Sequence, residues 1–561
     1  MFYKKSIAMQ IKNSSFSIRQ PLLLLIAVVA GILLGATIFS KSPQSFKATK
    51  SYQKFRQVLD LIANDYVDTV NTEELVDYSI EKMLEKLDPH TVYIRSAEVQ
   101  AARSQLDGGF DGIGIEFNVF KDTVQVMNVL PNGPSETAGL QIGDKIVLVD
   151  GKPMFDNKKA DNSSVFKKLK GAKGTQVTIS ILRKNMKNLL DFTIKRGRIP
   201  NYSIEADYMV DNKTGYIKVS SFGENTYEEF KKALKSLKDK GMTQLMLDLR
   251  GNGGGYLDRA VNMVDEMLDG NKMIVYTDGK GNRYDQKFFA ERNGLFERGA
   301  IIVLIDEGSA SASEITSGAL QDNDRALVVG RRSFGKGLVQ SPVTLEDGAE
   351  VRLTISRYYT PSGRSIQKPY SKEGKTEDYS RELQKRMEHG EFYSADSIHF
   401  DEKLKFKTTK GRTVYGGGGI MPDYFVPLDT TFSTKYYGEL WSNNVIREFV
   451  FNYFSANRKA LENMDFKTFA KNFVVNDNMM QQFIALGEKS GVTFNAKDYA
   501  RSEKLLRTQI KALLAGSLYK HDSFGKRNEF YQVMNTNDEI FQKAMTLFDE
   551  AAKVEKGTFN K

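Results

Sequence analysis

A short serine-rich segment is the first place where the chain offers chemistry. Residues 308–314 read Gly-Ser-Ala-Ser-Ala-Ser-Glu and directly follow an apolar run at residues 300–306. A helical pattern begins near Ala312, so Ser311 lies between an expected strand and an expected helix. A serine there exposes its hydroxyl, and the N–H of the next residue points to where an oxyanion would form. Ser311 and Glu314 also match the capping box S-x-x-E, and the stretch taken alone favours this structural role over a nucleophile.

A serine nucleophile needs a general base, and the sequence offers Lys336. This lysine lies between two glycines in residues 333–340, which read S-F-G-K-G-L-V-Q. A neutral lysine can act as a base if burial lowers its pKa from about 10.4 toward neutrality. Gln340 would orient the amine only if the chain bends between the two residues, because four extended residues span about 13 Å.

A glycine-rich turn is the third candidate. Residues 245–255 read L-M-L-D-L-R-G-N-G-G-G, an apolar strand that runs directly into the turn. Consecutive glycines allow positive φ and close backbone approach, so that N–H groups can be aimed at an anion. The helix-like run at residues 257–268 adds the positive end of a helix dipole. The segment is neither G-x-G-x-x-G nor a P-loop, and a purely structural turn is equally compatible with it.

Composition excludes several other classes of site. The chain has 561 residues, no cysteine and 4 histidines, with 40% hydrophobic and 27% charged residues. Thiolate nucleophiles, disulfides, zinc–thiolate sites and iron–sulfur clusters are therefore excluded, and we expect no metal and no cofactor. The net charge of +10 comes from 80 Lys+Arg and 70 Asp+Glu. No basic block with interleaved aromatics is present, so we expect no nucleic-acid partner, while a basic patch for a membrane or an acidic partner stays open.

The surrounding pattern predicts the elements that must position these residues. Residues 51–103 read as helical, with a stop at the proline of L-D-P-H-T, residues 87–91. Residues 108–195 form short β-rich runs separated by glycine-containing turns. Residues 200–430 alternate strands and helices, which is typical of an α/β layer, and residues 435–561 are mostly amphipathic helix.

An uncharged apolar run near the N-terminus predicts export. Residues 22–39 carry no charge over eighteen positions, which is just long enough for a transmembrane helix. Lys4, Lys5, Lys12 and Arg19 precede the run, so the positive-inside rule keeps residues 1–20 in the cytoplasm. A cleaved signal peptide is the rival, because residues 35–37 (Gly-Ala-Thr) make a passable cleavage site. We favour the uncleaved anchor, with the rest of the chain on the extracytoplasmic, periplasmic side.

The three candidate segments together resemble the carboxyl-terminal processing peptidases, the tail-specific serine proteases with a Ser/Lys dyad. That family's glycine turn, serine segment and lysine segment match residues 247–255, 308–314 and 334–340. Residues 87–91, 357–363 and 417–423 also resemble family segments. The resemblance implies that Ser311 is the nucleophile, Lys336 the base and Gln340 the residue that orients the lysine. It further implies oxyanion donors at the backbone N–H groups of Ala312 and Gly254, and we take His90 as structural.

The β-rich segment resembles a PDZ domain. Residues 110–117 (F-D-G-I-G-I-E-F) resemble the carboxylate-binding loop, and residues 138–146 with 149–151 resemble the second half of the domain. Successive N–H groups of a glycine-rich turn beside an edge strand can hold a terminal carboxylate while the peptide adds a strand. The candidate contacts are Gly112, Ile113, Gly114 and Ile115.

The resemblance, which spans about residues 50–430, implies an α/β protein with a crotonase/Clp-like spiral protease core and an inserted PDZ domain. The residue pattern adds an N-terminal transmembrane helix and a helical C-terminal extension that matches nothing diagnostic. We expect a cytoplasmic tail (1–20), an anchor (21–40), a helical region (45–103), the PDZ domain (104–195), the core (196–430) and the extension (431–561). The expected function is a serine endopeptidase that recognises the apolar C-termini of protein substrates and cleaves through an acyl-enzyme. A homo-oligomer stays open.

Two other classes remain as alternatives. A non-catalytic PDZ scaffold would bind C-termini without needing Lys336. A crotonase-like acyl-CoA enzyme could use the same oxyanion turn, but it would not explain a PDZ domain or an export anchor.

Overall fold

The computed structural model describes residues 50–104, 106–120, 123–155, 161–184, 186–370, 379, 381–399, 401–519 and 525–559. The chain divides into two compact units, residues 1–79 and 80–561. The first contains helix α2 (Lys50–Asp65) and most of α3 (Thr72–Leu84), and neither helix has a buried residue. Within the described ranges no helix is long and apolar enough to cross a membrane, and the apolar run at residues 22–39 lies outside them.

A six-stranded sheet forms the centre of the second unit. Its strand order is β10-β11-β12-β15-β16-β21, antiparallel between β10 and β11 and parallel from β11 onward. The strands are β10 (Ile204–Met209), β11 (Thr214–Val219), β12 (Gln244–Asp248), β15 (Ile301–Ile305), β16 (Leu327–Gly330) and β21 (Tyr424–Phe425). The apolar run expected as a buried strand is β15, and every residue in it is buried, as in a parallel strand covered on both faces.

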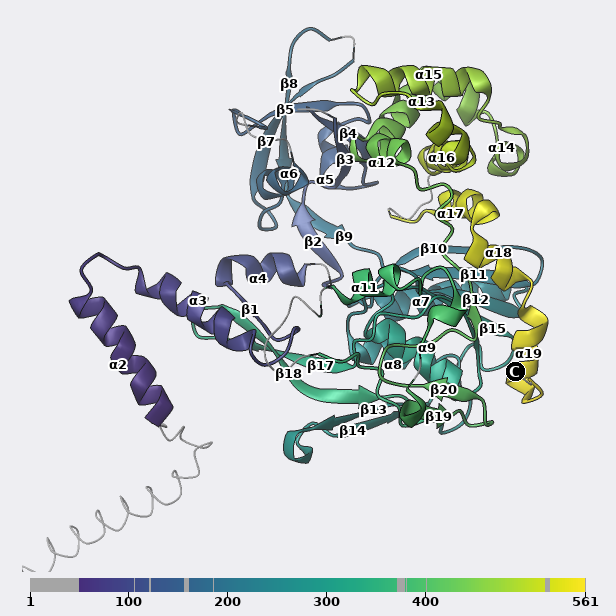
Figure 1. Ribbon diagram of the computed structural model, residues 1–561. Helices are drawn as coiled ribbons and strands as arrows, with labels where there is room; N and C mark the ends of the chain where they lie inside the picture. Colours follow the sequence, from purple (N-terminus) through teal and green to yellow (C-terminus); the bar gives the residue numbers. More distant parts are fainter. Residues whose placement is uncertain are drawn as a thin grey trace, which may run out of the picture. The chain divides into compact units, whose positions relative to one another are not determined.

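Helices cover both faces of this sheet (Figure 1). Helices α7 (Thr226–Asp239), α8 (Leu257–Asp265) and α9 (Ala312–Asp322) share one hydrophobic cluster with Ile301, Val303 and Ile305 of β15. Helices α18 (Glu539–Met545) and α19 (Phe548–Lys556) share a second cluster with Ile302 and Leu304. Because alternate residues of a strand face opposite sides, the two clusters lie on opposite faces of the sheet. The helices α18 and α19, which belong to the expected C-terminal extension, thus pack on the central sheet.

A second sheet carries the segment around Lys336. Its strands are β1 (Val92–Ile94), β13 (Met273–Gly279), β14 (Gln286–Phe289), β17 (Leu338–Thr344) and β18 (Glu350–Tyr359), with β1, β13 and β17 all paired to β18. Residues 51–103 were expected to be helical with a stop at residues 87–91, but the strand β1 follows that stop before α4 (Ser96–Arg103). The sequence Val-Tyr-Ile is β-prone and finds an antiparallel partner in β18, so tertiary pairing decides its structure.

The β-rich segment forms a small domain with its own hydrophobic cluster. Its strands are β3 (Ile115–Phe120), β4 (Thr123–Val129), β5 (Lys145–Val149), β6 (Lys152–Pro153), β7 (Gln176–Leu182) and β8 (Leu190–Lys195), and its helices are α5 (Pro134–Ala138) and α6 (Asn162–Leu169). Strand β3 is at the edge of the sheet. Strands β2 (Gly109–Gly112) and β9 (Gly197–Pro200) pair where the chain enters and leaves, as expected of an inserted domain.

The remaining elements include the helical region near the C-terminus. Helices α12 (Lys435–Ser442), α13 (Val445–Glu462), α14 (Phe466–Asn472), α15 (Asp477–Lys489), α16 (Ala496–Leu518) and α17 (Asn528–Met534) contribute to a hydrophobic cluster of their own. Helix α11 (Glu382–Glu388), strands β19 (Lys405–Lys407) and β20 (Thr413–Tyr415), and short 3₁₀ turns at Lys280–Asn282, Ala395–Ser397, Glu402–Leu404 and Asn535–Asn537 complete the described elements. The helical pattern predicted beyond residue 435 agrees with this arrangement.

Candidate active site

Ser311 lies at the junction between the central sheet and helix α9. It is the N-cap residue of α9, and its backbone adopts φ 54° and ψ −112°. A positive φ is costly for a residue with a side chain, so such residues persist only where their surroundings hold them, often at functional sites. The serine is therefore both a cap, as the capping-box pattern predicted, and a strained residue at a strand-to-helix junction.

The Glu314 carboxylate connects the serine segment to the lysine segment. Its Oε2 accepts the backbone N–H of Ser311 at 2.8 Å and that of Lys336 at 2.9 Å. Its Oε1 accepts the hydroxyl of Ser333 at 2.5 Å and the N–H of Gly335 at 2.7 Å. Burial raises the pKa of Glu314 to about 7, while these donated hydrogen bonds oppose the rise. Because all four partners donate, the ionised carboxylate is the form that satisfies them.

Tyr358 of β18 makes a second connection between the same segments. Its hydroxyl is within hydrogen-bond reach of the Ser311 carbonyl, at 3.1 Å, and of the Lys336 carbonyl. Burial raises the pKa of Tyr358 well above its usual value, so the phenol keeps its proton. Tyr358 belongs to the R-Y-Y-T-P-S-G segment at residues 357–363, but its residue type alone gave no sign of this contact.

Lys336 directs its amine at Gln340. The Nζ donates to Gln340 Oε1 at 2.9 Å, and Gln340 Nε2 donates to the carbonyl of His90. The chain bends as required, since Gly335 has φ +90° and β17 starts only at Leu338. Burial lowers the pKa of Lys336, although the charges of Asp88 and Glu314 act in the opposite direction. This shift favours the neutral amine that a base requires.

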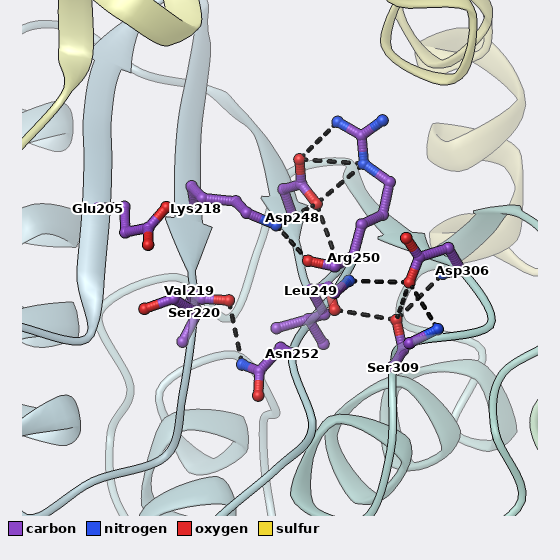
Figure 2. A network of polar contacts seen from close by, with 12 residues as sticks. Glu205, Lys218, Val219, Ser220, Asp248, Leu249, Arg250, Asn252, Asp306 and Ser309 are labelled. Carbon is purple, nitrogen blue, oxygen red and sulfur yellow. Dashed lines mark hydrogen bonds and ion pairs between the residues drawn. The ribbon is translucent and has the colours of Figure 1, made fainter. Parts of the chain in front are cut away.

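A buried charge network holds the end of β12, where the glycine turn begins. Figure 2 shows Asp248 between Lys218 and Arg250. Asp248 accepts Lys218 Nζ at 3.2 Å and the Arg250 N–H at 2.9 Å, and Arg250 binds Asp538 through two contacts of 2.9 and 2.7 Å. Burial alone would raise the pKa of Asp248, but Arg250 and Lys218 hold it well below its usual range. Asp538 is the N-cap of α18, so the end of the chain reaches this turn.

Short polar contacts bring the glycine turn against the serine segment. Asp306 accepts the N–H of Gly251 at 2.8 Å, and the Ser309 hydroxyl donates to the Leu249 carbonyl at 2.9 Å (Figure 2). The Ala310 N–H also donates to the carbonyl of Asn252 at 3.0 Å. The turns after β12 and β15 are therefore fixed to each other, as parallel neighbours that end at the same edge allow.

Gly254 packs directly against Ser311, but its N–H is used elsewhere. Its φ is +99°, and a Cβ at this position would lie 2.7 Å from Ser311 Cβ and 2.7 Å from the Ala310 oxygen, so no other residue fits without movement. The N–H expected to bind an oxyanion instead donates to Asn252 Oδ1 at 2.8 Å. The Asn252 amide is held in turn by the Val219 carbonyl at 3.0 Å. Ala312, the other expected donor, supplies the first N–H of α9, which has no partner within the helix.

The predicted catalytic residues are thus gathered, but not all of them touch. Lys336 and Gln340 bond directly, and the backbones of Ser311 and Lys336 share Glu314 and Tyr358. In the described part of the chain, no hydrogen bond joins the Ser311 hydroxyl to the Lys336 amine. The same part contains no group of three His, Asp or Glu residues that could hold a metal ion.

The predicted peptide-binding loop connects β2 to the edge strand β3. Gly112 ends β2, Ile113 is buried, Gly114 has φ +75° and Ile115 begins β3. The Ile113 carbonyl accepts the N–H and hydroxyl of Ser135 at 3.1 and 2.6 Å, and these two bonds fix the loop to helix α5. An edge strand next to a fixed glycine loop is the arrangement that strand addition needs.

Lys170 is a residue of this region that the sequence did not reveal. Its Nζ lies 4.3 Å from the ring centroid of Phe110 and 4.9 Å from that of Phe166. Burial lowers the pKa of Lys170. It is one of many lysines in the sequence, and only the fold brings its ammonium next to Phe110, the residue at the start of the loop segment.

Comparisons with known proteins match four parts of the chain. Residues 213–380 match the model of peptidase family S41, and residues 112–194 match the PDZ domain. Residues 35–97 match the N-terminal domain of the activating protease CtpB, and residues 436–520 match a family of unknown function, DUF8443.

Curated relatives align over more than half of the chain. A carboxy-terminal-processing protease of Bartonella bacilliformis is 34% identical over 348 residues, which is 60% of this chain and 79% of that protein. The carboxy-terminal processing protease CtpB of Bacillus subtilis is 37% identical over 332 residues, covering 57% of this chain and 66% of that protein. CtpA of the same organism is 31% identical over 355 residues, covering 62% and 74%.

Replacing Glu314 by glutamine tests the connection between the two segments. The new NH₂ group would face two donors, so we expect Glu314→Gln to lose about 1–3 kcal/mol of stability and about a hundredfold in peptide cleavage. The wild type should also lose stability as pH rises from about 4.5 to about 7, because the raised pKa favours the neutral carboxyl in the folded state, and the variant should not. Thermal unfolding and cleavage assays measure both effects.

Glu307→Gln is the matched control, because that carboxylate accepts from the guanidinium of Arg331 at 2.8 and 3.2 Å. Wild-type cleavage by Glu314→Gln, or an equal loss in both variants, would contradict the role of Glu314.

Proposed function

The chain belongs to peptidase family S41, the family of the carboxy-terminal processing proteases, and we propose that it cleaves proteins with Ser311 as nucleophile and Lys336 as general base. The predicted resemblance is confirmed, and the protein is a serine-type endopeptidase with a PDZ domain. The observation that carries the assignment of the two residues is the Glu314 carboxylate, which binds the backbone N–H of both at 2.8 and 2.9 Å.

Acylation begins with a proton transfer. Lys336 Nζ takes the proton of the Ser311 hydroxyl, and Ser311 Oγ forms a bond to the carbonyl carbon of the scissile peptide. The carbonyl electron pair moves to the oxygen, where the Ala312 N–H stabilises the negative charge. The Gly254 N–H joins it once its bond to Asn252 Oδ1 is released. Collapse of the intermediate breaks the C–N bond, and the Lys336 ammonium returns its proton to the leaving amine.

Deacylation repeats the same steps with water. Lys336 removes a proton from a water molecule, whose oxygen attacks the acyl carbon. The ester bond to Ser311 breaks, and the serine recovers its proton from Lys336. Because Gln340 and Glu314 already hold the lysine segment, only the side chains of Ser311 and Lys336 have to come within about 2.6–3.2 Å of each other when substrate binds.

Single substitutions in the dyad should abolish cleavage without unfolding the protein. We expect Ser311→Ala and Lys336→Ala to lose at least about a thousandfold in kcat/KM on an unfolded protein substrate, since each removes a group that makes or breaks a bond. Ser317→Ala is the control, because Ser317 is a buried serine of the same helix whose hydroxyl donates to the Ser313 carbonyl at 2.8 Å. Cleavage at the wild-type rate by either dyad variant would contradict the assignment of Ser311 as nucleophile and Lys336 as base, and no cleavage by the wild type would favour the non-catalytic scaffold.

We further propose that the PDZ domain, residues 104–195, captures the C-terminus of the substrate. The loop at Gly112, Ile113, Gly114 and Ile115 would bind the terminal carboxylate, and the peptide would pair with the edge strand β3. Lys170 adds a positive charge next to this loop. For the rest of the chain, we propose a helical region at residues 45–103 and a protease core at residues 196–430. The helices α18 and α19 pack on this core. A crotonase/Clp-like spiral is supported by the parallel strands β11, β12, β15 and β16 and the helices that cover them.

Amidating the substrate tests recognition of the C-terminus. A peptide with a free apolar C-terminus should bind at least about tenfold more tightly than the same peptide with a C-terminal amide, because the amide removes the charge that the loop recognises. Fluorescence anisotropy with the Ser311→Ala variant measures binding without cleavage. Equal affinity for the two peptides would rule out carboxylate recognition by this loop.

We propose that residues 22–39 anchor the protein in the membrane with the protease on the extracytoplasmic side. The basic residues before the uncharged run support this orientation. The full chain should stay in the membrane fraction after an alkaline carbonate wash, and a variant without residues 22–39 should not. A soluble chain that begins close to residue 38 would show instead that the segment is a cleaved signal peptide.

A further inference from the structure

Hydrogen bonds to the side chain of Asp88 fix the turn at residues 88–91. Asp88 Oδ1 accepts the N–H groups of His90 and Thr91, both at 2.8 Å, and Oδ2 accepts the Thr91 hydroxyl at 2.6 Å. The Thr354 hydroxyl of β18 adds a contact of 3.2 Å to Oδ1. Asp88 and Thr91 are 8% and 3% exposed, so this carboxylate fixes a buried turn.

The carbonyl at the centre of this turn decides how the Gln340 amide is oriented. Gln340 Nε2 donates to the His90 carbonyl, and Gln340 Oε1 accepts from Lys336 Nζ at 2.9 Å. A carbonyl can only accept, so it holds the NH₂ end of the amide and leaves the oxygen for the lysine. A neutral lysine then uses an N–H toward Gln340 and keeps its lone pair for a proton. A reversed amide would present a donor to the amine and occupy that lone pair.

We propose that Asp88 is a positioning residue for the catalytic lysine: it fixes the His90 carbonyl, which orients Gln340 so that the lone pair of Lys336 stays available for the serine proton. This role rests on the proposed Ser/Lys mechanism and adds to it a turn more than two hundred residues away in the sequence.

The side chain of His90 supports the same turn. Its Nε2 and the Tyr379 hydroxyl are 2.7 Å apart, and the two rings meet edge to face with centroids 5.1 Å apart. Burial, together with the charges of Lys336 and Lys368, lowers the pKa of His90 to about 4, so the ring is neutral when the enzyme works. The His90 side chain thus anchors the turn, and its backbone serves the base.

Asp88 also acts on Lys336 through its charge. Among the groups that act on the lysine, Asp88 and Glu314 raise its pKa and Arg352 lowers it. Removing the Asp88 charge should therefore lower the pKa of Lys336. Loss of orientation and loss of charge have different signatures, since the first lowers the rate at high pH and the second moves the rising part of the pH profile to lower pH.

The chain contains a matched control for this turn. Asp211 Oδ1 accepts the N–H groups of Lys213 and Thr214 at 2.9 and 2.7 Å, and Oδ2 accepts the Thr214 hydroxyl at 2.9 Å. This Asp-x-x-Thr turn joins β10 to β11 in the central sheet and repeats the bonding pattern of residues 88–91. Asp211→Ala and Asp211→Asn therefore make the same chemical change at a turn that does not contact Gln340.

The experiment measures the rate of Ser311 labelling by a fluorophosphonate between about pH 6 and pH 10, the range in which a lysine with a lowered pKa ionises. Asp88→Ala should lower the high-pH rate at least about tenfold and shift the rising part of the profile to lower pH. Asp88→Asn keeps an oxygen that accepts both N–H groups, so it should recover most of the high-pH rate and retain the shift. Both Asp211 variants should follow the wild-type profile.

The variants Thr91→Val and Lys336→Ala separate a failure of the Asp88 role from a failure to fold and from a failure of the Ser/Lys mechanism. If Asp88→Ala does not fold, Thr91→Val removes the hydroxyl that donates to Asp88 and accepts the Thr354 N–H, without changing the charge of the turn. It should lower the high-pH rate without a shift. Equal profiles for the Asp88 and Asp211 variants, while Lys336→Ala abolishes labelling, would overturn the role of Asp88 alone. Wild-type labelling of Lys336→Ala would overturn the proposed mechanism and this role with it.

Discussion

The buried carboxylate of Glu314 is the interaction on which the rest of the site depends. Ser311 follows β15 of the central sheet, and Lys336 lies between the neighbouring strand β16 and β17 of the second sheet, so the two residues are in separate loops. Glu314 joins them by accepting the backbone N–H of both, and the Tyr358 hydroxyl repeats the connection on their carbonyls. Burying a carboxylate is costly unless it is fully hydrogen-bonded, and here the same bonds that compensate its burial align the proposed nucleophile with the proposed base.

The other proposed catalytic groups are each held by contacts with a distant part of the chain. The glycine turn is held by Asp248 and Arg250, and Arg250 binds Asp538 at the start of α18. Gln340 is held by the carbonyl of His90. The C-terminal helices therefore have a place in the core, since α18 and α19 cover one face of the central sheet and Asp538 completes the network at its edge.

The sequence predicted the elements well where a pattern is local. The apolar run of β15, the start of α9 and the glycine turn follow from periodicity and residue type, and the family resemblance gave the roles of Ser311, Lys336 and Gln340. Contacts between distant residues were out of reach. Glu314 was read only as a cap, because its bonds to Gly335 and Lys336 depend on tertiary packing. For the same reason the strand β1 was not foreseen, nor was the bond from the Asn252 amide to the Val219 carbonyl, which holds the Asn252 oxygen at the Gly254 N–H.

The central claim is that Lys336 is a neutral amine held in place to accept a proton, and the most direct test is to measure its pKa. Nuclear magnetic resonance of protein labelled with ¹³C at the lysine ε-carbons, with Lys336→Arg used to assign the signal, reports this ionisation. We predict that the Lys336 signal titrates below the ordinary lysine value of 10.5, because burial disfavours the ammonium. A Lys336 signal that titrates at or above that value would contradict it.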